Sequence, residues 1–153
     1  MARGHSDASG DGRPSAEQLF TQLSRRSQSE LAQRLREAKL EGARVPHIHV
    51  TTYLRPEGSR LTELADRAGV TRPTMVELVD DLERLGFVER RPDPADRRAK
   101  LICLTDQGRR ATRTSHAIVV ELEAEYARLI GAERFEAMCD AMQALLGTDR
   151  ESG

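Results

Sequence analysis

The fold is decided by residues 61–91, which read LTELADRAGVTRPTMVELVDDLERLGFVERR. Thr62 is a candidate N-cap of a short helix that Gly69 ends, and Thr71 is a candidate N-cap of a second helix. The turn between them is only about three residues long, so the two helices must cross steeply. Apolar residues stand at the offsets that place them between the helices: Leu64, Ala68, Val70, Met75 and Leu78. The spacing predicts a helix-turn-helix.

A β-hairpin is predicted directly after this unit. Residues 87–91 (FVERR) and 100–104 (KLICL) are short runs on either side of a loop that contains Pro92 and Pro94. Two such runs around a loop rich in Pro and Asp favour a hairpin. We interpret the hairpin as the wing of a winged helix-turn-helix.

Amphipathic helices are predicted on both flanks. Residues 16–41 form the first, which Gly42 ends, and a short helix runs from Pro46 to about Leu54. Thr105 and Gly108 open a long helix that Gly131 ends, and a last helix covers about 133–146. The long helix carries one apolar face, and the last helix is expected to bury four side chains: Ile118, Leu122, Tyr126, Leu129 and Ile130 on the former, and Phe135, Met138, Met142 and Leu145 on the latter.

The expected fold is therefore mainly α: a winged helix-turn-helix with a two-stranded β wing and a helical dimerisation region from both termini. We expect a flexible N-terminal arm over 1–15 and a flexible tail over 148–153. The DNA-binding domain covers 46–109, and the dimerisation region covers 16–45 and 110–147. The flanking stripes exceed what a small helix-turn-helix needs for its own core, so we expect a two-fold homodimer with its reading helices about 10 base pairs apart.

Composition excludes several other classes of protein. The 153 residues hold 24 Lys and Arg against 25 Asp and Glu, so net charge alone indicates no partner. No apolar run approaches the roughly 20 residues that span a bilayer, and no secretory signal is evident, so we expect a cytoplasmic protein without a membrane partner. Cys103 and Cys139 are expected to be buried thiols. We find no catalytic constellation and no cofactor motif, so an enzyme is not expected.

Five segments resemble the winged helix-turn-helix core of the MarR family of bacterial transcriptional regulators. They are residues 61–65 (LTELA), 71–74 (TRPT), 78–91 (LVDDLERLGFVERR), 93–100 (DPADRRAK) and 104–108 (LTDQG). The resemblance implies a homodimer that binds a pseudo-palindromic operator in double-stranded DNA, usually as a repressor. It also implies release by a small aromatic or phenolic effector.

The hairpin is basic within a nearly neutral chain. Arg98 is predicted to enter the minor groove, with Asp96 holding its guanidinium group. Arg97 and Lys100 are predicted to contact phosphates, and Arg91 belongs to the same DNA-binding set. The hairpin has five positive and three negative residues: Arg90, Arg91, Arg97, Arg98 and Lys100 against Glu89, Asp93 and Asp96.

On the second helix of the motif, Met75, Leu78, Val79 and Leu82 should face inward. The residues left to face DNA are Thr71, Arg72, Pro73, Thr74 and Glu77. The two threonines suit phosphates at the helix N-terminus, and Arg72 suits a guanine.

Glu77 and Asp81 stand where family members often carry Arg, and Val76 replaces a hydroxyl residue. Glu77 could accept a hydrogen bond from a cytosine amino group while Val76 packs on a thymine methyl, an interpretation that the intact wing favours. Repulsion from phosphates would instead weaken or abolish DNA binding, leaving a winged-helix module for protein interaction. Ordinary solvation of Glu77, Asp80 and Asp81 is a third interpretation.

Histidines near the predicted second helix suggest an effector site. Family members form a ligand crevice there, so His49 and Tyr53 are candidate ligand-binding residues. A zinc-responsive regulator is an alternative. However, His47 and His49 would point about 200° apart on a helix, so they cannot easily chelate one metal together, and we predict no metal site.

Overall fold

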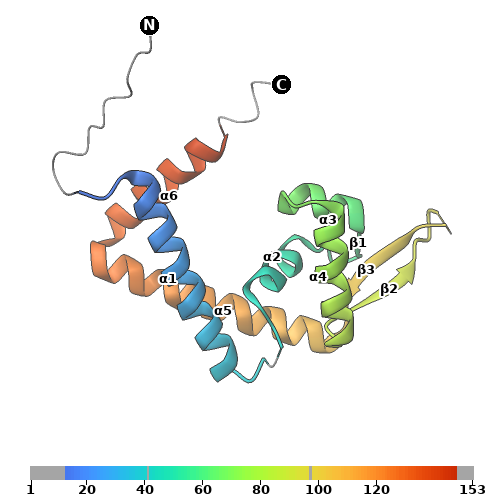
Figure 1. Ribbon diagram of the computed structural model, residues 1–153. Coiled ribbons are helices and arrows are strands. Elements are labelled where there is room, and N and C mark those ends of the chain that lie inside the picture. Colours follow the sequence, from blue (N-terminus) through green and yellow to red (C-terminus); the bar gives the residue numbers. More distant parts are fainter. Residues whose placement is uncertain (1–12, 41, 97, 148–153) are drawn as a thin grey trace, which may run out of the picture.

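A computed structural model describes residues 13–40, 42–96 and 98–147 (Figure 1). Most of the predicted tail, and residues 1–12 of the predicted arm, lie outside these ranges, whereas Ser15 caps the first helix through the backbone N–H of Gln18. The elements in chain order are α1 (Ala16–Glu37), α2 (Val45–Tyr53), β1 (Ser59–Arg60), α3 (Leu61–Ala68), α4 (Arg72–Arg84), β2 (Val88–Pro92), β3 (Lys100–Leu104), α5 (Asp106–Ile130) and α6 (Ala132–Gly147).

The winged helix-turn-helix is present, with one strand more than predicted. β2 and β3 form the antiparallel hairpin, in which Arg90 pairs with Ile102. β1 pairs antiparallel with the other edge of β3, where Ser59 faces Ile102, so the sheet order is β1-β3-β2. A strand of two residues is too short to show alternation in sequence, which is why the prediction of a two-stranded sheet missed it.

Two predicted helix boundaries are wrong. Arg60, not Thr62, is the N-cap residue of α3, because β1 leads straight into this helix. α1 ends at Glu37 rather than at Gly42, since Lys39 adopts a left-handed backbone with φ of 56°. The predicted caps inside the motif are correct: Gly69 is left-handed at the end of α3, and the Thr71 hydroxyl accepts from the backbone N–H of Thr74.

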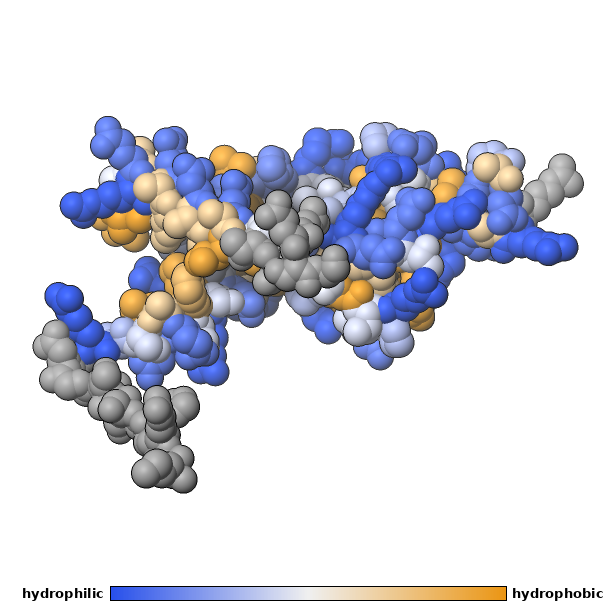
Figure 2. Space-filling view, turned by 90° about the horizontal axis from the view of Figure 1, so that it is seen from above, coloured by the Kyte–Doolittle hydropathy of each residue, from blue (hydrophilic) through white to orange (hydrophobic). Residues whose placement is uncertain are grey.

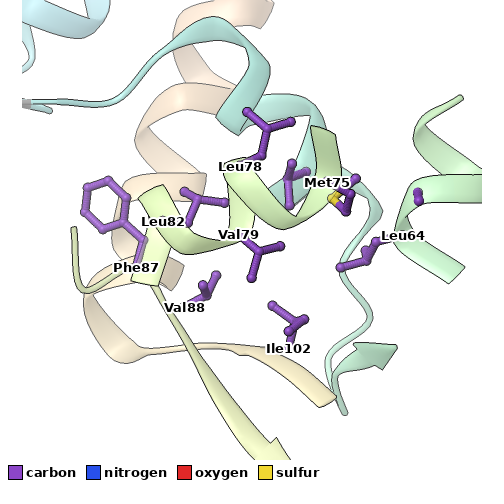
Figure 3. Packing of buried hydrophobic residues seen from close by; sticks show 10 residues of the cluster. Leu64, Met75, Leu78, Val79, Leu82, Phe87, Val88 and Ile102 are labelled. Carbon is purple, nitrogen blue, oxygen red and sulfur yellow. The ribbon is translucent and has the colours of Figure 1, made fainter. Parts of the chain in front are cut away.

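The core of the winged unit lies on the inner face of α4 (Figure 3). Met75 and Val79 have no exposed surface, and Leu78 and Leu82 are also buried, as predicted. They pack with Leu64 of α3, Phe87, Val88 of β2 and Ile102 of β3. Burying side chains of this size contributes roughly 1.5 to 3 kcal/mol each, so the rotation of α4 about its axis is fixed by its apolar face.

A second cluster joins the flanking helices, with Leu31 and Leu35 of α1 against Ile118 and Leu122 of α5. The predicted burial of α6 is wrong for a single chain: no residue of α6 is buried, because this helix packs only along the end of α5. Figure 2 shows hydrophobic residues at the surface of the half of the molecule that holds these helices. The exposed large apolar residues there are Leu19, Phe20, Leu23, Leu129, Ile130, Leu145 and Leu146.

Gly108→Ala should prevent stable folding of the winged unit. A Cβ atom at this position would lie 1.8 Å from the carbonyl oxygen of Phe87, a backbone atom that cannot move aside. We expect a loss of at least about 3 kcal/mol in the free energy of unfolding, measured by urea denaturation. Gly147→Ala is the control, because nothing lies within 4 Å of that Cβ. Equal stability of the two variants would contradict the close approach of α5 to Phe87.

Candidate nucleic-acid interface

The outer face of α4 presents the residues that were predicted to read DNA. Thr71, Arg72, Pro73, Thr74 and Glu77 are all exposed, and they occupy the N-cap and first two turns of the helix. The hydroxyls of Thr71 and Thr74 lie 2.8 Å apart and share a hydrogen bond. The structure therefore brings this set together at one exposed helix end, where backbone N–H groups and the helix dipole favour an anion such as phosphate.

The other acidic side chains of α4 are paired inside the molecule. Asp81 is half-buried and forms ion pairs with Arg44, which precedes α2, and with Arg84. Asp80 accepts from Arg90 Nη2 at 2.5 Å, and Glu83 pairs with the same guanidinium group. These contacts explain Asp80 and Asp81 as structural residues. They weaken the interpretation in which phosphate repulsion abolishes DNA binding.

Arg90 consequently does not belong to the surface charge of the wing. Its guanidinium is bound between two carboxylates of α4, which ties β2 to that helix. Glu77 differs from the paired acids, because it has neither a hydrogen bond nor an ion pair with any residue that the structure describes. Glu77 is thus the acidic side chain of α4 that is available to a partner.

The hairpin projects past α3 and α4, at the end of the molecule opposite α1 and α6 (Figure 1). Arg98 and Lys100 are exposed near its tip, and Arg97 lies outside the described residues. Arg91 is exposed but donates to Glu89. The side chains of Arg98 and Lys100 are therefore the described wing cations best placed to meet a partner.

The predicted role of Asp96 is wrong in its detail. Its carboxylate accepts from the backbone N–H of Arg98 at 3.0 Å and makes no bond to the Arg98 guanidinium group. An Asp side chain that bonds the backbone two residues on forms an Asx-turn. Asp96 therefore shapes the loop and leaves the Arg98 side chain extended from the tip.

A second aspartate, Asp93, anchors the base of this loop and was missed as a site residue. Only 6% of its surface is exposed. It accepts from the backbone N–H of Ala95 at 2.8 Å and from Arg60 Nε of β1 at 2.8 Å. The Ala95 hydrogen bond, followed by the Arg60 guanidinium, holds the pKa of Asp93 below its usual range. The Asp-Pro-Ala sequence could have indicated the Asx-turn, but the Arg60 contact depends on the unpredicted strand.

A crevice of about 630 Å³ lies between α1, α2 and α5. His49 lines it, as the effector prediction requires, whereas Tyr53 is exposed and is not among its lining residues. His116 of α5 also lines the crevice and was not singled out from the sequence. This location matches the predicted ligand region, so the crevice is the candidate effector site.

His47 lies on the other side of α2, in the protein interior. Its Nδ1 accepts from the backbone N–H of Arg44 at 3.1 Å, and its Nε2 lies 3.6 Å from Asp81. Burial, followed by the nearby Arg44 charge, lowers the pKa of His47. The neutral ring thus caps α2 and connects it to α4.

Metal and membrane sites find no support in the described part of the chain. No group of three or more His, Cys, Asp or Glu residues there is placed to hold a metal ion. Cys103 is a buried free thiol, and Cys139 is a half-buried one. No described helix combines the length and apolar character needed to cross a bilayer.

Comparison with known proteins gives consistent matches. A family model described as MarR family matches residues 52–99. The transcriptional repressor CouR bound to a 23-mer DNA duplex aligns with a TM-score of 0.77 at 24% identity, over 86% of this chain and 92% of CouR. CouR from Rhodococcus jostii RHA1 bound to p-coumaroyl-CoA aligns with a TM-score of 0.71 at 29% identity, over 84% and 90% of the two chains. A MarR-family transcriptional regulator from Rhodococcus sp. RHA1 gives 0.72 at 28% identity, also over 84% and 90%.

Stability should fall on acidification through His47. The unfolded chain binds a proton near pH 6.5, whereas the folded protein keeps the ring neutral to lower pH. The stability from this residue is therefore complete above about pH 6.5 and is lost as the pH falls toward the lowered folded-state pKa, by at most about 1.4 kcal/mol per pH unit.

Urea denaturation of the wild type and His47→Gln between pH 5 and 7.5 measures this contribution. The glutamine carbonyl can still accept from Arg44, so the variant should fold and show a shallower dependence on pH. His116→Gln, at an exposed position on α5, is the control. Identical pH profiles for the wild type and His47→Gln would refute the assignment.

Proposed function

We propose that this chain, which belongs to the MarR family of transcriptional regulators, is a homodimeric repressor that binds operator DNA and is released by a small molecule. It is a regulator and not an enzyme. The observation that carries the proposal is the joint exposure of the α4 N-terminus and the arginine-bearing tip of the hairpin, held at one end of the molecule by a shared core. The similar repressor CouR is bound to a DNA duplex in one structure and to p-coumaroyl-CoA in another.

The two exposed elements have the dimensions and chemistry for adjacent grooves of a duplex. The first turns of α4 enter the major groove, where Arg72 donates to a guanine and Glu77 accepts from a cytosine. Thr71 and Thr74 bind phosphate at the helix N-terminus. Arg98 enters the minor groove, and Arg97, Lys100 and Arg91 contribute phosphate contacts beside it.

A second copy of the chain completes the reader. The exposed apolar side chains of α1, α5 and α6 form the dimerisation region, within residues 16–45 and 110–147, and the winged unit within 46–109 is the DNA-binding part. A two-fold axis through that region presents two copies of α4 to sites about 10 base pairs apart. A partner of this kind places the protein in the bacterial cytoplasm.

Effector control is assigned to the crevice that His49 lines. α2 forms one wall of this crevice, and the same helix contacts α4 through His47 and Asp81. A ligand that shifts α2 therefore also shifts the reading helix. The zinc-responsive alternative has no such observation in its favour.

Arg98→Ala should weaken operator binding by about 1 to 3 kcal/mol, because it removes the minor-groove cation. The duplex is one that the protein selects from a randomised pool, and binding is followed by fluorescence anisotropy. The loss should be largest for sites with A·T-rich flanks, which attract an inserted arginine. Arg134→Ala removes the same charge from exposed α6 and is the control. Equal affinities for the two variants would remove Arg98 from the interface.

Glu77→Gln should change base preference more than stability. The outward carboxylate accepts from a cytosine amino group, whereas an amide also donates and suits adenine. Selection from a randomised pool with wild type and variant should show a changed preference at one position in each half-site. Asp80→Asn is the control, since Asp80 is paired with Arg90. An unchanged consensus sequence with uniformly tighter binding would mean that Glu77 only repels phosphate.

A further inference from the structure

The crevice between α1, α2 and α5 has an uncharged wall. Of the described residues that line it, none is Asp, Glu, Lys or Arg. Its volume of about 630 Å³ suits a small molecule of one or two rings. Its aliphatic side chains are Leu31, Val45, Ile48 and Val119, and the rest of the wall is polar.

Three hydroxyl groups of this wall have already donated their only proton. Thr51 Oγ1 and Thr52 Oγ1 both donate to the carbonyl oxygen of Ile48, at 3.0 and 2.8 Å. Ser115 Oγ donates to the carbonyl oxygen of Thr112 at 3.0 Å. A hydroxyl has one proton and two lone pairs, so each of these groups can offer a ligand lone pairs only.

The remaining polar groups do not reverse this bias. Gln28 Nε2 donates to Ser24 Oγ at 3.2 Å, which leaves the Gln28 carbonyl oxygen as an acceptor. The rings of His49 and His116 offer one donor and one acceptor each when neutral. The wall therefore presents an excess of acceptors and no cation.

Thr112 adds an unsatisfied group to the same wall. Its hydroxyl oxygen is buried and has no hydrogen-bond partner among the described residues. A buried hydroxyl without a partner is costly, so a bound molecule whose polar group reaches Thr112 gains more than one that leaves it unpaired. This points to a ligand with a polar group directed at α5.

We infer, on the premise of the function proposed above, that the crevice selects an uncharged aromatic molecule bearing hydrogen-bond donors, such as a phenol, and rejects carboxylates. A carboxylate entering this wall would lose its water and meet lone pairs without a compensating cation, which disfavours the charged form strongly. A phenolic hydroxyl donates to Ser115 or Thr51 while its ring packs on Val45 and Ile48.

Three probes with the same bicyclic body test the inference directly. 2-Naphthol carries a donor, 2-methoxynaphthalene lacks it, and 2-naphthoate is an anion. Isothermal titration calorimetry of the full chain at pH 7 should show 2-naphthol binding at least about tenfold more tightly than either of the others. Equal or tighter binding of 2-naphthoate, or no binding of 2-naphthol, would overturn the inference.

Two variants identify the acceptors. Ser115→Ala and Thr51→Val should each reduce the preference for 2-naphthol over its methyl ether by about three- to tenfold. Thr114→Val is the matched control, because this exposed threonine on α5 also donates to a helix carbonyl but does not line the crevice. An undiminished preference in both crevice variants would contradict the assigned wall.

Anisotropy with the selected duplex separates this inference from the proposed function. A protein that binds DNA but prefers 2-naphthoate retains its function and refutes the ligand class. A protein that prefers 2-naphthol in calorimetry but binds no DNA refutes the function and leaves the ligand class supported.

Discussion

Burial of one face of α4 is the constraint on which the rest of the structure depends. Met75, Val79 and Leu82 are held in the core of the winged unit, so the opposite face of the same helix must point outward. Phe87 and Ile102 belong to that core and begin or complete the hairpin, so the wing is positioned by the same packing. The reading helix and wing tip are consequently presented as one rigid surface, which reduces the entropy lost on binding a duplex.

Ion pairs then set the orientation of the parts around this core. Asp81 links α4 to Arg44 at the start of α2, while Asp93 links the wing loop to Arg60 of β1. The first of these joins the reading helix to the helix that lines the effector crevice. Such a contact gives ligand binding a physical route to DNA binding, because a shift of α2 changes the partners of Asp81.

Sequence reasoning recovers the parts of this structure that local chemistry determines. Thr71, Gly69 and the inward set on α4 follow from capping and helical periodicity, so the helix-turn-helix was predictable. β1, the Arg60–Asp93 pair and the partners of Asp81 were not, because each joins segments far apart in sequence. The acidic residues of α4 therefore looked alike in sequence, although only Glu77 faces outward without a partner among the described residues. Burial of α6 failed as a prediction for the complementary reason that its apolar face is left uncovered within one chain.

Hydroxyl-radical footprinting of the protein on its selected duplex tests the central claim most directly. Two copies of α4 in successive major grooves, each with its wing in the flanking minor groove, should protect backbone segments symmetrically about a dyad, with half-site centres about 10 base pairs apart. Protection should extend into the minor groove outside each half-site. A single unsymmetrical patch, or no protection at low salt without any effector, would contradict the account.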